Sequence, residues 1–529
     1  MSSSTGEAAE QAATPPAAVP EAVPEAAPAA PPLRDAVLSG RFFGAAHGQI
    51  AEALAGFIAG AEARPLASWF GPTAAARLAA DRDALRGAID RDIAAIDASI
   101  SAQLDAVLHA DRLSRLEGSW RGLAWLVDGI EPAARVKVRI LNVSWSEICR
   151  DLERAAEFDQ SHLFRRIYED EFGTPGGEPF GMVVVDHEVR HRRMPGYATD
   201  DVAALSLLAG VAAAAFAPMV LAASPTLLEV GGFDELATVH DPAASFRGTE
   251  HARWRGLSSR EDMRFLALTL PRVLARSPWP DDPARADGFR YCEYAPDVAS
   301  RVWTTAGYAF AFAVVRAYAN HGWPADVRGT ETDQRNGGLV DELPAEAFSP
   351  EPRSVWVRPS LDVVLTDRQE RSLVEAGLMP LSALPFGEQA MFGAVRSLQA
   401  PAQFNGANAA AANANARISA QLNSMLCVSR FAHYLKMKGR EMVGSFQRAE
   451  DIESRLQAWL SSYVNAGTGA SQDALARFPL VSARVLVKER AGKPGVFGCV
   501  IHLQPQFQLD DVSATFRLVT DIVAPGAKA

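Results

Sequence analysis

The chain has 529 residues, of which 48% are hydrophobic and 22% are charged. This composition excludes a wholly disordered or collagen-like protein, and the length predicts about two to four packed units. The formal net charge of -11 argues against a general nucleic-acid-binding surface. The four cysteines lie far apart without C-x-x-C spacing, which argues against a zinc ribbon or a disulfide framework and favours a reducing cytoplasm.

The N-terminal segment, residues 1–35, is rich in alanine and proline. Such a composition cannot bury enough apolar surface to offset the entropy of ordering it, so we expect a disordered tail. The segment also lacks the basic and apolar regions of a secretory signal, and we therefore expect a cytoplasmic protein.

An N-terminal helical region is predicted over residues 36–118. Apolar side chains recur there at helical spacing on one face, at Leu85, Ile89, Ile93, Ile96, Ile100, Leu104 and Val107. We expect this stripe to pack on its own domain, in a helix that ends near Gly118. The alternative is a coiled-coil seam between Leu78 and Val107, through which the chain would act as a helical oligomeric scaffold.

A central α/β domain is predicted over residues 119–400, where strand and helix patterns alternate. Strands are predicted at Val136–Val143 and, buried on both faces, at Phe180–Val185. Capping boxes predict helices that start at Ser144 and at Ser258. The predicted fold class is α/β of the mixed α+β kind, with several domains and a central mixed sheet flanked by helices.

One uncharged stretch in this domain, Val202–Ala223, is about as long as a membrane span. Its high alanine content drives insertion weakly, and Asp200 and Asp201 precede it without a nearby basic residue. We therefore expect no membrane helix here.

The C-terminal domain, residues 401–529, is predicted to hold a helix followed by β-strands. The helix carries four basic residues, Arg430, Lys436, Lys438 and Arg440, which form either a solvated face or a docking surface for an acidic partner. Alternating residues after Val481 and the run Val496–Leu503 predict a β-hairpin around an AGKPG turn, with a third strand near Thr515–Val519. The free edges of such a hairpin favour strand exchange with another chain.

The segment His187-Glu188-Val189-Arg190-His191 matches H-E-x-x-H, in which two histidines on one helix face bind zinc beside a glutamate base. Here the motif follows a strand-like run and is closed by Pro195, so the two histidines are not expected one helical turn apart. A third ligand such as Glu229 is conceivable, but nothing in the sequence singles it out. A zinc-dependent hydrolase stays as an alternative function.

The sequence does not contain the other catalytic motifs that were considered. The chain has no G-x-S-x-G, and its only Gly-Lys pair, Gly492-Lys493, is followed by proline inside a turn. We therefore predict a structural protein with no catalytic residues, no metal ligands and no cofactor.

Six long segments together resemble one bacterial family. They are LEGSWRGLAWLV (116–127), SHLFRRIYEDEFGTPGGEPFGMVVVD (161–186), SSREDMRFLALTLPRVL (258–274), AMFGAVRSLQAP (390–401), SRFAHYLKMKGREMVGSF (429–446) and PGVFGCVIHLQPQFQLDD (494–511). They are similar, in order, to the large subunit of the type VI secretion contractile sheath, the TssC/VipB/EvpB family. We interpret the chain as either the main large subunit or a divergent paralogue, because its first 72 residues do not resemble the usual N-terminal leader of this family.

The resemblance implies a structural role. The expected partners are a small sheath subunit of the TssB/VipA type, further copies of the chain in a helical lattice, an inner tube of the Hcp type, baseplate components and, as a further candidate, a ClpV-type unfoldase. No nucleic acid or membrane partner is expected. Inter-subunit strand exchange is assigned to Val481, Val485, Val487, Val496, Val500, Ile501 and Leu503, and tube contact is assigned to the helix with Arg430, Lys436, Lys438 and Arg440.

Overall fold

The computed structural model describes residues 32–40, 47–60, 64–174, 176–284, 288–330, 335–352, 354–385, 387–406, 409–443, 448–465, 472–489, 497–506 and 516–522. The chain divides into two compact units. The first comprises residues 1–104 and 281–291, and the second comprises residues 105–280 and 292–529.

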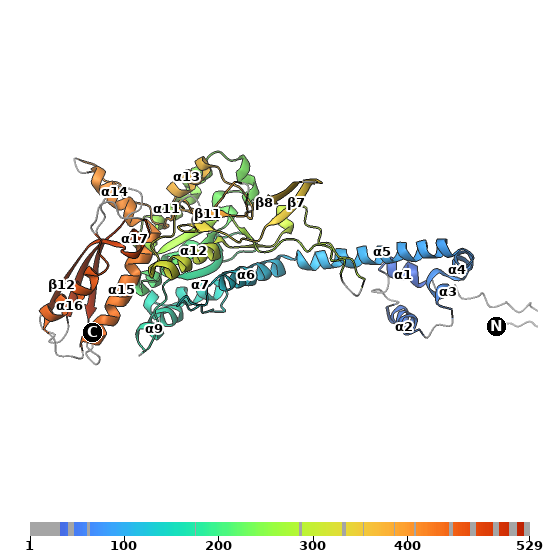
Figure 1. Cartoon of the computed structure of the whole chain (residues 1–529), viewed down its shortest axis with the longest axis horizontal. Coiled ribbons are helices and arrows are strands. Elements are labelled where there is room, and N and C mark those ends of the chain that lie inside the picture. The colour runs from blue at the N-terminus through green and yellow to red at the C-terminus, as the bar shows by residue number, and fades with distance from the viewer. Residues whose placement is uncertain are drawn as a thin grey trace, which may run out of the picture. The chain divides into compact units, whose positions relative to one another are not determined.

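Helices and strands alternate through much of the chain (Figure 1). The α-helices are α1 Leu33–Leu38, α2 His47–Ile58, α3 Pro65–Phe70, α4 Pro72–Ala79, α5 Arg82–Leu108, α6 Asp111–Asp128, α7 Trp145–Arg154, α8 His162–Phe164, α9 Asp170–Phe172, α10 Asp201–Ala215, α11 Ala252–Ser258, α12 Ala306–His321, α13 Asp367–Glu375, α14 Ala409–Ser419, α15 Leu422–Val443, α16 Ala449–Ser461 and α17 Gln472–Arg477. The strands are β1 Val183–Val189, β2 Met219–Ala223, β3 Leu266–Leu270, β4 Val273–Leu274, β5 Trp303–Thr304, β6 Leu339–Val340, β7 Glu346–Glu351, β8 Ser354–Arg358, β9 Met379–Pro380, β10 Ser382–Ala383, β11 Ala390–Met391, β12 Leu480–Glu489, β13 Phe497–Pro505 and β14 Phe516–Ile522.

The described helices of the first unit are organised around a buried carboxylate on α5. Asp92 accepts hydrogen bonds from Arg34 Nε at 2.8 Å and from Trp69 Nε1 at 2.9 Å. Burial alone would raise the pKa of Asp92, but these two bonds outweigh burial and hold the pKa below its usual range. The carboxylate thereby links α1 and α3 to α5.

The apolar stripe of α5 does not pack as the sequence predicts. Ile93 is 50% exposed and Val107 is 58% exposed, and Ile89, Ile100 and Leu104 are exposed as well. The prediction that this stripe packs on its own domain is therefore wrong for the described residues. The helix also ends at Leu108, and Gly118 lies inside the following helix α6.

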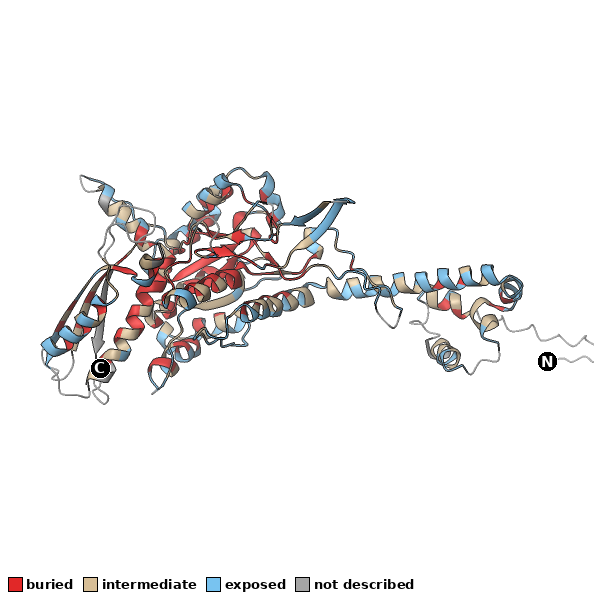
Figure 2. Cartoon of the chain, in the orientation of Figure 1, coloured by how far each residue is buried: buried red, intermediate tan, exposed pale blue. Residues whose placement is uncertain are grey.

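A four-stranded parallel sheet, in the order β1-β2-β3-β9, forms the centre of the second unit. Side chains that alternate along β2 fill two cores. Met219 and Leu221 belong to the core that includes Leu205 of α10, whereas Val220 packs in the core that includes Phe310 of α12. Helices thus cover both faces of the sheet, and Figure 2 shows its central strands β2 and β3 as buried.

The predicted α/β fold class is confirmed, with small antiparallel sheets beside the parallel one. Two local predictions are wrong. Residues 135–144, including Val136–Val143, are not assigned to a strand. The helix predicted after Ser258 is instead a 3-10 helix, Glu261–Phe265, followed by β3, because the apolar run Leu266–Leu270 inserts into the sheet.

Other predictions hold in part. The capping box of Ser144 and Glu147 opens α7 as predicted. The strand predicted at Phe180 begins at Val183 and is only half-buried. Among the residues that the structure describes, none of the helices combines the length and the apolar character needed to cross a membrane.

Candidate functional site: assembly surfaces

The C-terminal sheet confirms the predicted hairpin and third strand. β12 and β14 both pair antiparallel with the central strand β13, with Val485 opposite Ile501 and Ile501 opposite Leu518. Of the residues assigned to strand exchange, Val485, Val487, Ile501 and Leu503 are buried and Val481 and Val500 are half-buried, whereas Val496 and the AGKPG turn lie outside the described residues. The buried side chains join the main core of the second unit. The side chains therefore hold the sheet to its own chain, and an added strand would have to use backbone groups at an edge.

The outer edge of β12 is occupied by side chains of α16. Gln457 Nε2 donates to the Ala483 carbonyl at 2.9 Å, and Gln457 Oε1 accepts from the Val485 amide at 2.9 Å. Glu453 Oε2 accepts from the Val487 amide at 2.8 Å. A side-chain amide presents one donor and one acceptor, as a peptide group does, so Gln457 bonds this edge as a neighbouring strand would.

This arrangement fixes which backbone groups of β14 face outward. In an antiparallel pair, both backbone groups of a residue point to the same side. The backbone groups of Val485 face Gln457 and hence point away from β13. Those of its partner Ile501 therefore point to β14, and those of Leu518 point back to β13. The neighbouring Val519 then directs its amide away from the sheet, and β14 is the second edge of the described sheet.

A second extended segment, residues 135–144, crosses the surface of the second unit. Lys137 Nζ bonds Glu178 at 2.6 Å, and Arg139 forms an ion pair with Glu171. These two basic residues hold one side of the segment against the body. The apolar side chains between and beyond them are exposed: Val138, Ile140, Leu141 and Val143. The segment thus combines extended backbone with an uncovered apolar face.

The basic residues of α15 lie against aromatic rings of their own chain. The Arg430 guanidinium is 4.7 Å from the Tyr434 ring centroid, Lys436 Nζ is 5.0 Å from that of Tyr168, and Lys438 Nζ is 5.3 Å from that of Trp459. All three cations are half-buried, and the side chain of Arg440 lies outside the described residues. The described basic residues of α15 therefore do not form a fully solvated face.

The HEVRH segment does not form the helix of a zincin, because His187 and Glu188 lie in β1. This agrees with the expectation that the two histidines are not one helical turn apart. His187 Nε2 is 3.1 Å from Asp201 Oδ2, and its ring stacks on Trp145. Burial alone would raise the pKa of Asp201, but the hydrogen bond from His187 helps to hold it below its usual range. The Glu188 carboxylate forms an ion pair with Arg272 Nε at 2.6 Å. The residue that would be the general base in a zincin is therefore bound to a guanidinium group.

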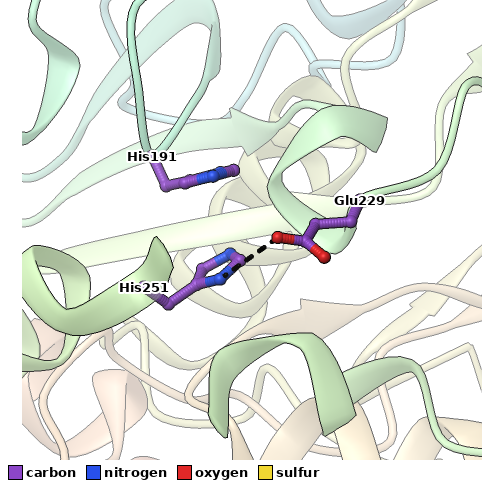
Figure 3. Close-up of side chains that lie close together, drawn as sticks. All are labelled: His191, Glu229 and His251. Carbon is purple, nitrogen blue, oxygen red and sulfur yellow. Dashed lines mark ion pairs between the residues drawn. The ribbon is translucent and has the colours of Figure 1, made fainter. Parts of the chain in front are cut away.

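His191 lies elsewhere, in a group whose third member, His251, sequence reasoning missed. Its ring stacks on His251 with centroids 4.1 Å apart, and one ligand atom from each of His191, Glu229 and His251 lies within 4.8 Å of the others (Figure 3). Burial, followed by the nearby His251, lowers the pKa of His191 to about 4, so its imidazole is neutral at pH 7. His251 is sixty positions from His191, and no local pattern in the sequence links them.

Two family matches follow one another along the chain. Residues 90–399 match the family described as EvpB/VC_A0108, tail sheath N-terminal domain, and residues 411–522 match its tail sheath gpW/gp25-like domain. The chain belongs to this tail-sheath family. It is thus a structural sheath subunit of the TssC/VipB/EvpB type, as the sequence predicts.

A curated relative of this tail-sheath chain is the type VI secretion system sheath protein TssC1 of Pseudomonas aeruginosa. The two are 35% identical over 451 residues, which cover 84% of this chain and 87% of the relative. The solved structure of a sheath tail protein from Desulfitobacterium hafniense has a TM-score of 0.28 and 13% identity, covering 60% of this chain and 59% of that one. A likeness this low carries no argument about the fold.

In this sheath subunit, Gln457→Ala is expected to lower the free energy of unfolding by about 1–3 kcal/mol, because it leaves the Val485 amide and the Ala483 carbonyl without their side-chain partner. Denaturant unfolding followed by tryptophan fluorescence measures the change. Arg455→Ala, an exposed position on the same helix, is the control and should change stability by less than about 0.5 kcal/mol. Equal stability of Gln457→Ala and the control would show that water replaces Gln457 at this edge without cost.

Proposed function

We propose that this chain is the large subunit of a type VI secretion contractile sheath in the cytoplasm. It pairs with a small sheath subunit, and the pairs polymerise around an inner tube and eject it by contraction. The observation that carries the proposal is the ordered pair of sheath-domain matches, which together span residues 90–522 with a short interruption. The 35% identity to a type VI sheath protein over most of both chains supports the same function.

The small sheath subunit is the occupant we assign to the extended segment 135–144. A partner strand laid along it would cover Val138 and Ile140 and would bond the extended backbone. The ion pairs of Lys137 and Arg139 hold the segment in place before the partner arrives, which reduces the entropy lost on binding.

Neighbouring large subunits are assigned to the C-terminal sheet. The edge of β12 is bonded by Gln457 and Glu453, so we place the added strand at the other edge, along β14. Such a strand gains backbone hydrogen bonds along its length and links one subunit to the next while the lattice changes shape.

Contact with an Hcp-type inner tube is assigned to α15, around Arg430, Lys436, Lys438 and Arg440. Cations held on aromatic rings keep defined positions, which suits an acidic partner surface. Baseplate components bind the sheath end, and a ClpV-type unfoldase is a further partner.

Contraction is a mechanical step. The extended lattice holds subunits in a less favourable packing, and contraction forms larger contacts while the strand links keep the subunits connected. The subunit supplies surfaces to this step and no catalytic group. A zinc hydrolase centred on His187, Glu188 and His191 is disfavoured, because Glu188 is paired with Arg272.

Co-expression of the full chain with a small sheath subunit of the TssB/VipA type tests the proposal. The expected result is co-purification of the two chains at equal stoichiometry and, by negative-stain electron microscopy, hollow tubules in the same preparation. Expression of either chain alone is the control and should give no tubules. Failure of the two soluble chains to co-purify would contradict the proposed function.

A further inference from the structure

The group formed by His191, Glu229 and His251 is built at the carboxyl edge of the parallel sheet. Val189 at the end of β1 is in register with Ala223 at the end of β2, and the Ser224 amide bonds the Val189 carbonyl at 3.0 Å. His191 follows β1, and Glu229 follows the short 3-10 helix after β2. In open α/β sheets, ligands bind on the side formed by the carboxyl ends of the strands.

His251 is oriented as a metal-binding histidine is. Its Nε2 lies 2.9 Å from the Leu227 carbonyl, which can only accept a hydrogen bond, so this nitrogen carries the proton. In the neutral ring, the lone pair is then on Nδ1, which faces Glu229 Oε1 at 3.7 Å. A backbone carbonyl that fixes the second ring nitrogen is the usual outer-shell partner of a histidine ligand.

The 3.7 Å separation is too long for a hydrogen bond and is close to the spacing across a bound metal ion. Two ligand atoms that are each about 2.1 Å from zinc lie about 3.4 Å apart at the tetrahedral angle. All three ligand atoms lie within 4.8 Å of one another, so small side-chain rotations would bring them to that spacing. Figure 3 shows the three side chains coming together from separate segments of the chain.

His191 provides the second, independent observation. It is 4% exposed, and within the described part of the chain neither of its ring nitrogens has a hydrogen-bond partner; nor has Nδ1 of His251, which is fully buried. Buried polar atoms of this kind are uncommon in native proteins, and a bound ion would satisfy them. Glu229, by contrast, has a 43% exposed side chain, so an ion could reach the group from solvent.

We propose that His191, Glu229 and His251 form a binding site for a divalent transition-metal ion of the zinc class. Two imidazoles and one carboxylate are a common three-residue ligand set for zinc, and the exposed side of Glu229 leaves the fourth position to water. The ion would hold together three segments that are separate in sequence. The HEVRH glutamate, Glu188, is paired with Arg272 and is therefore not available as a general base beside the ion. The site departs from the sequence-based expectation of no metal ligands and shares only His191 with the H-E-x-x-H motif.

The test uses the full-length chain, co-purified with its small subunit after removal of any histidine tag and stripped with a chelator. Added Co²⁺ should give the visible absorption of a tetrahedral site at one equivalent, and Zn²⁺ should abolish that absorption and raise the melting temperature. Glu229→Gln keeps the size of a partly exposed side chain and should weaken Co²⁺ binding at least tenfold, as should His251→Gln. His240→Gln, an exposed histidine elsewhere, should bind as the wild type does.

The outcomes separate the proposal from a neutral, stacked histidine pair. No Co²⁺ absorption and no effect of Zn²⁺ on melting would overturn the site. Equal metal binding by the wild type, Glu229→Gln and His240→Gln would mean an adventitious ion only. Glu229→Gln that folds, assembles and no longer binds Co²⁺ supports the proposal. Tubule formation, scored on the same samples, reports on the sheath function separately.

Discussion

Val519→Pro, in the edge strand β14, is expected to abolish long tubules while the large and small subunits still co-purify. The register places the Val519 amide on the outer side of β14, so the substitution removes no hydrogen bond to β13. Proline is tolerated on an edge strand, because the missing donor would otherwise face solvent. An incoming strand would lose that donor and would also meet the proline ring, which blocks pairing at this point.

Val519→Thr is the matched control, because threonine is β-branched and keeps the amide. It should assemble normally. Negative-stain microscopy and small-subunit pull-down from one preparation measure the two properties. Normal tubules from Val519→Pro would exclude strand addition at β14, and loss of the heterodimer would show that the substitution disrupts the subunit itself.

The same register explains why proline at Val485 is a poorer test of strand exchange. Val485 is 2% exposed and its amide already bonds Gln457, so Val485→Pro would remove an intramolecular hydrogen bond and disturb the core. The alternation of residues along the sequence predicts that Val485 lies in a strand. It does not predict that a helix side chain occupies the edge, because Gln457 is 28 residues away and its partner groups belong to the backbone.

Elements with strong local signals were predictable, and those decided by distant contacts were not. The capping box at Ser144 and the hairpin after Val481 were predicted because each signal is complete within a few residues. The composition of the run Leu266–Leu270 is compatible with a buried helix and with a buried strand. Pairing with β2 decides in favour of the strand. The stripe on α5 has a clear period, but a period alone does not say what covers it.

The candidate metal ligands show the same limit. His191 and Glu188 attract notice through a short motif, yet the motif carries no information about which side chains meet in space. β1 directs Glu188 to Arg272, and the loop after it brings His191 to His251. Only the topology of the parallel sheet makes the loops after β1 and β2 neighbours.

The second prediction concerns binding of the small subunit to the extended segment 135–144. Ile140→Asp is expected to prevent co-purification of the small subunit. Ile140 is 61% exposed in the isolated chain, so the stability of the subunit itself should change by less than about 0.5 kcal/mol. In the complex, the substitution loses the burial of the isoleucine side chain, about 1.5–3 kcal/mol, and adds the cost of burying a carboxylate. A total above about 3 kcal/mol weakens binding more than about a hundredfold.

Ile140→Val is the matched control, since it keeps an apolar β-branched side chain and should retain the partner. Pull-down of the small subunit measures binding, and denaturant unfolding of the large subunit measures its own stability. Co-purification of Ile140→Asp at the wild-type level would show that the small subunit binds elsewhere, although the sheath family of the chain would be unaffected. The prediction follows from the failed strand assignment: Val136–Val143 has the composition of a strand but no partner strand among the described residues, and a second chain can supply the partner that it lacks.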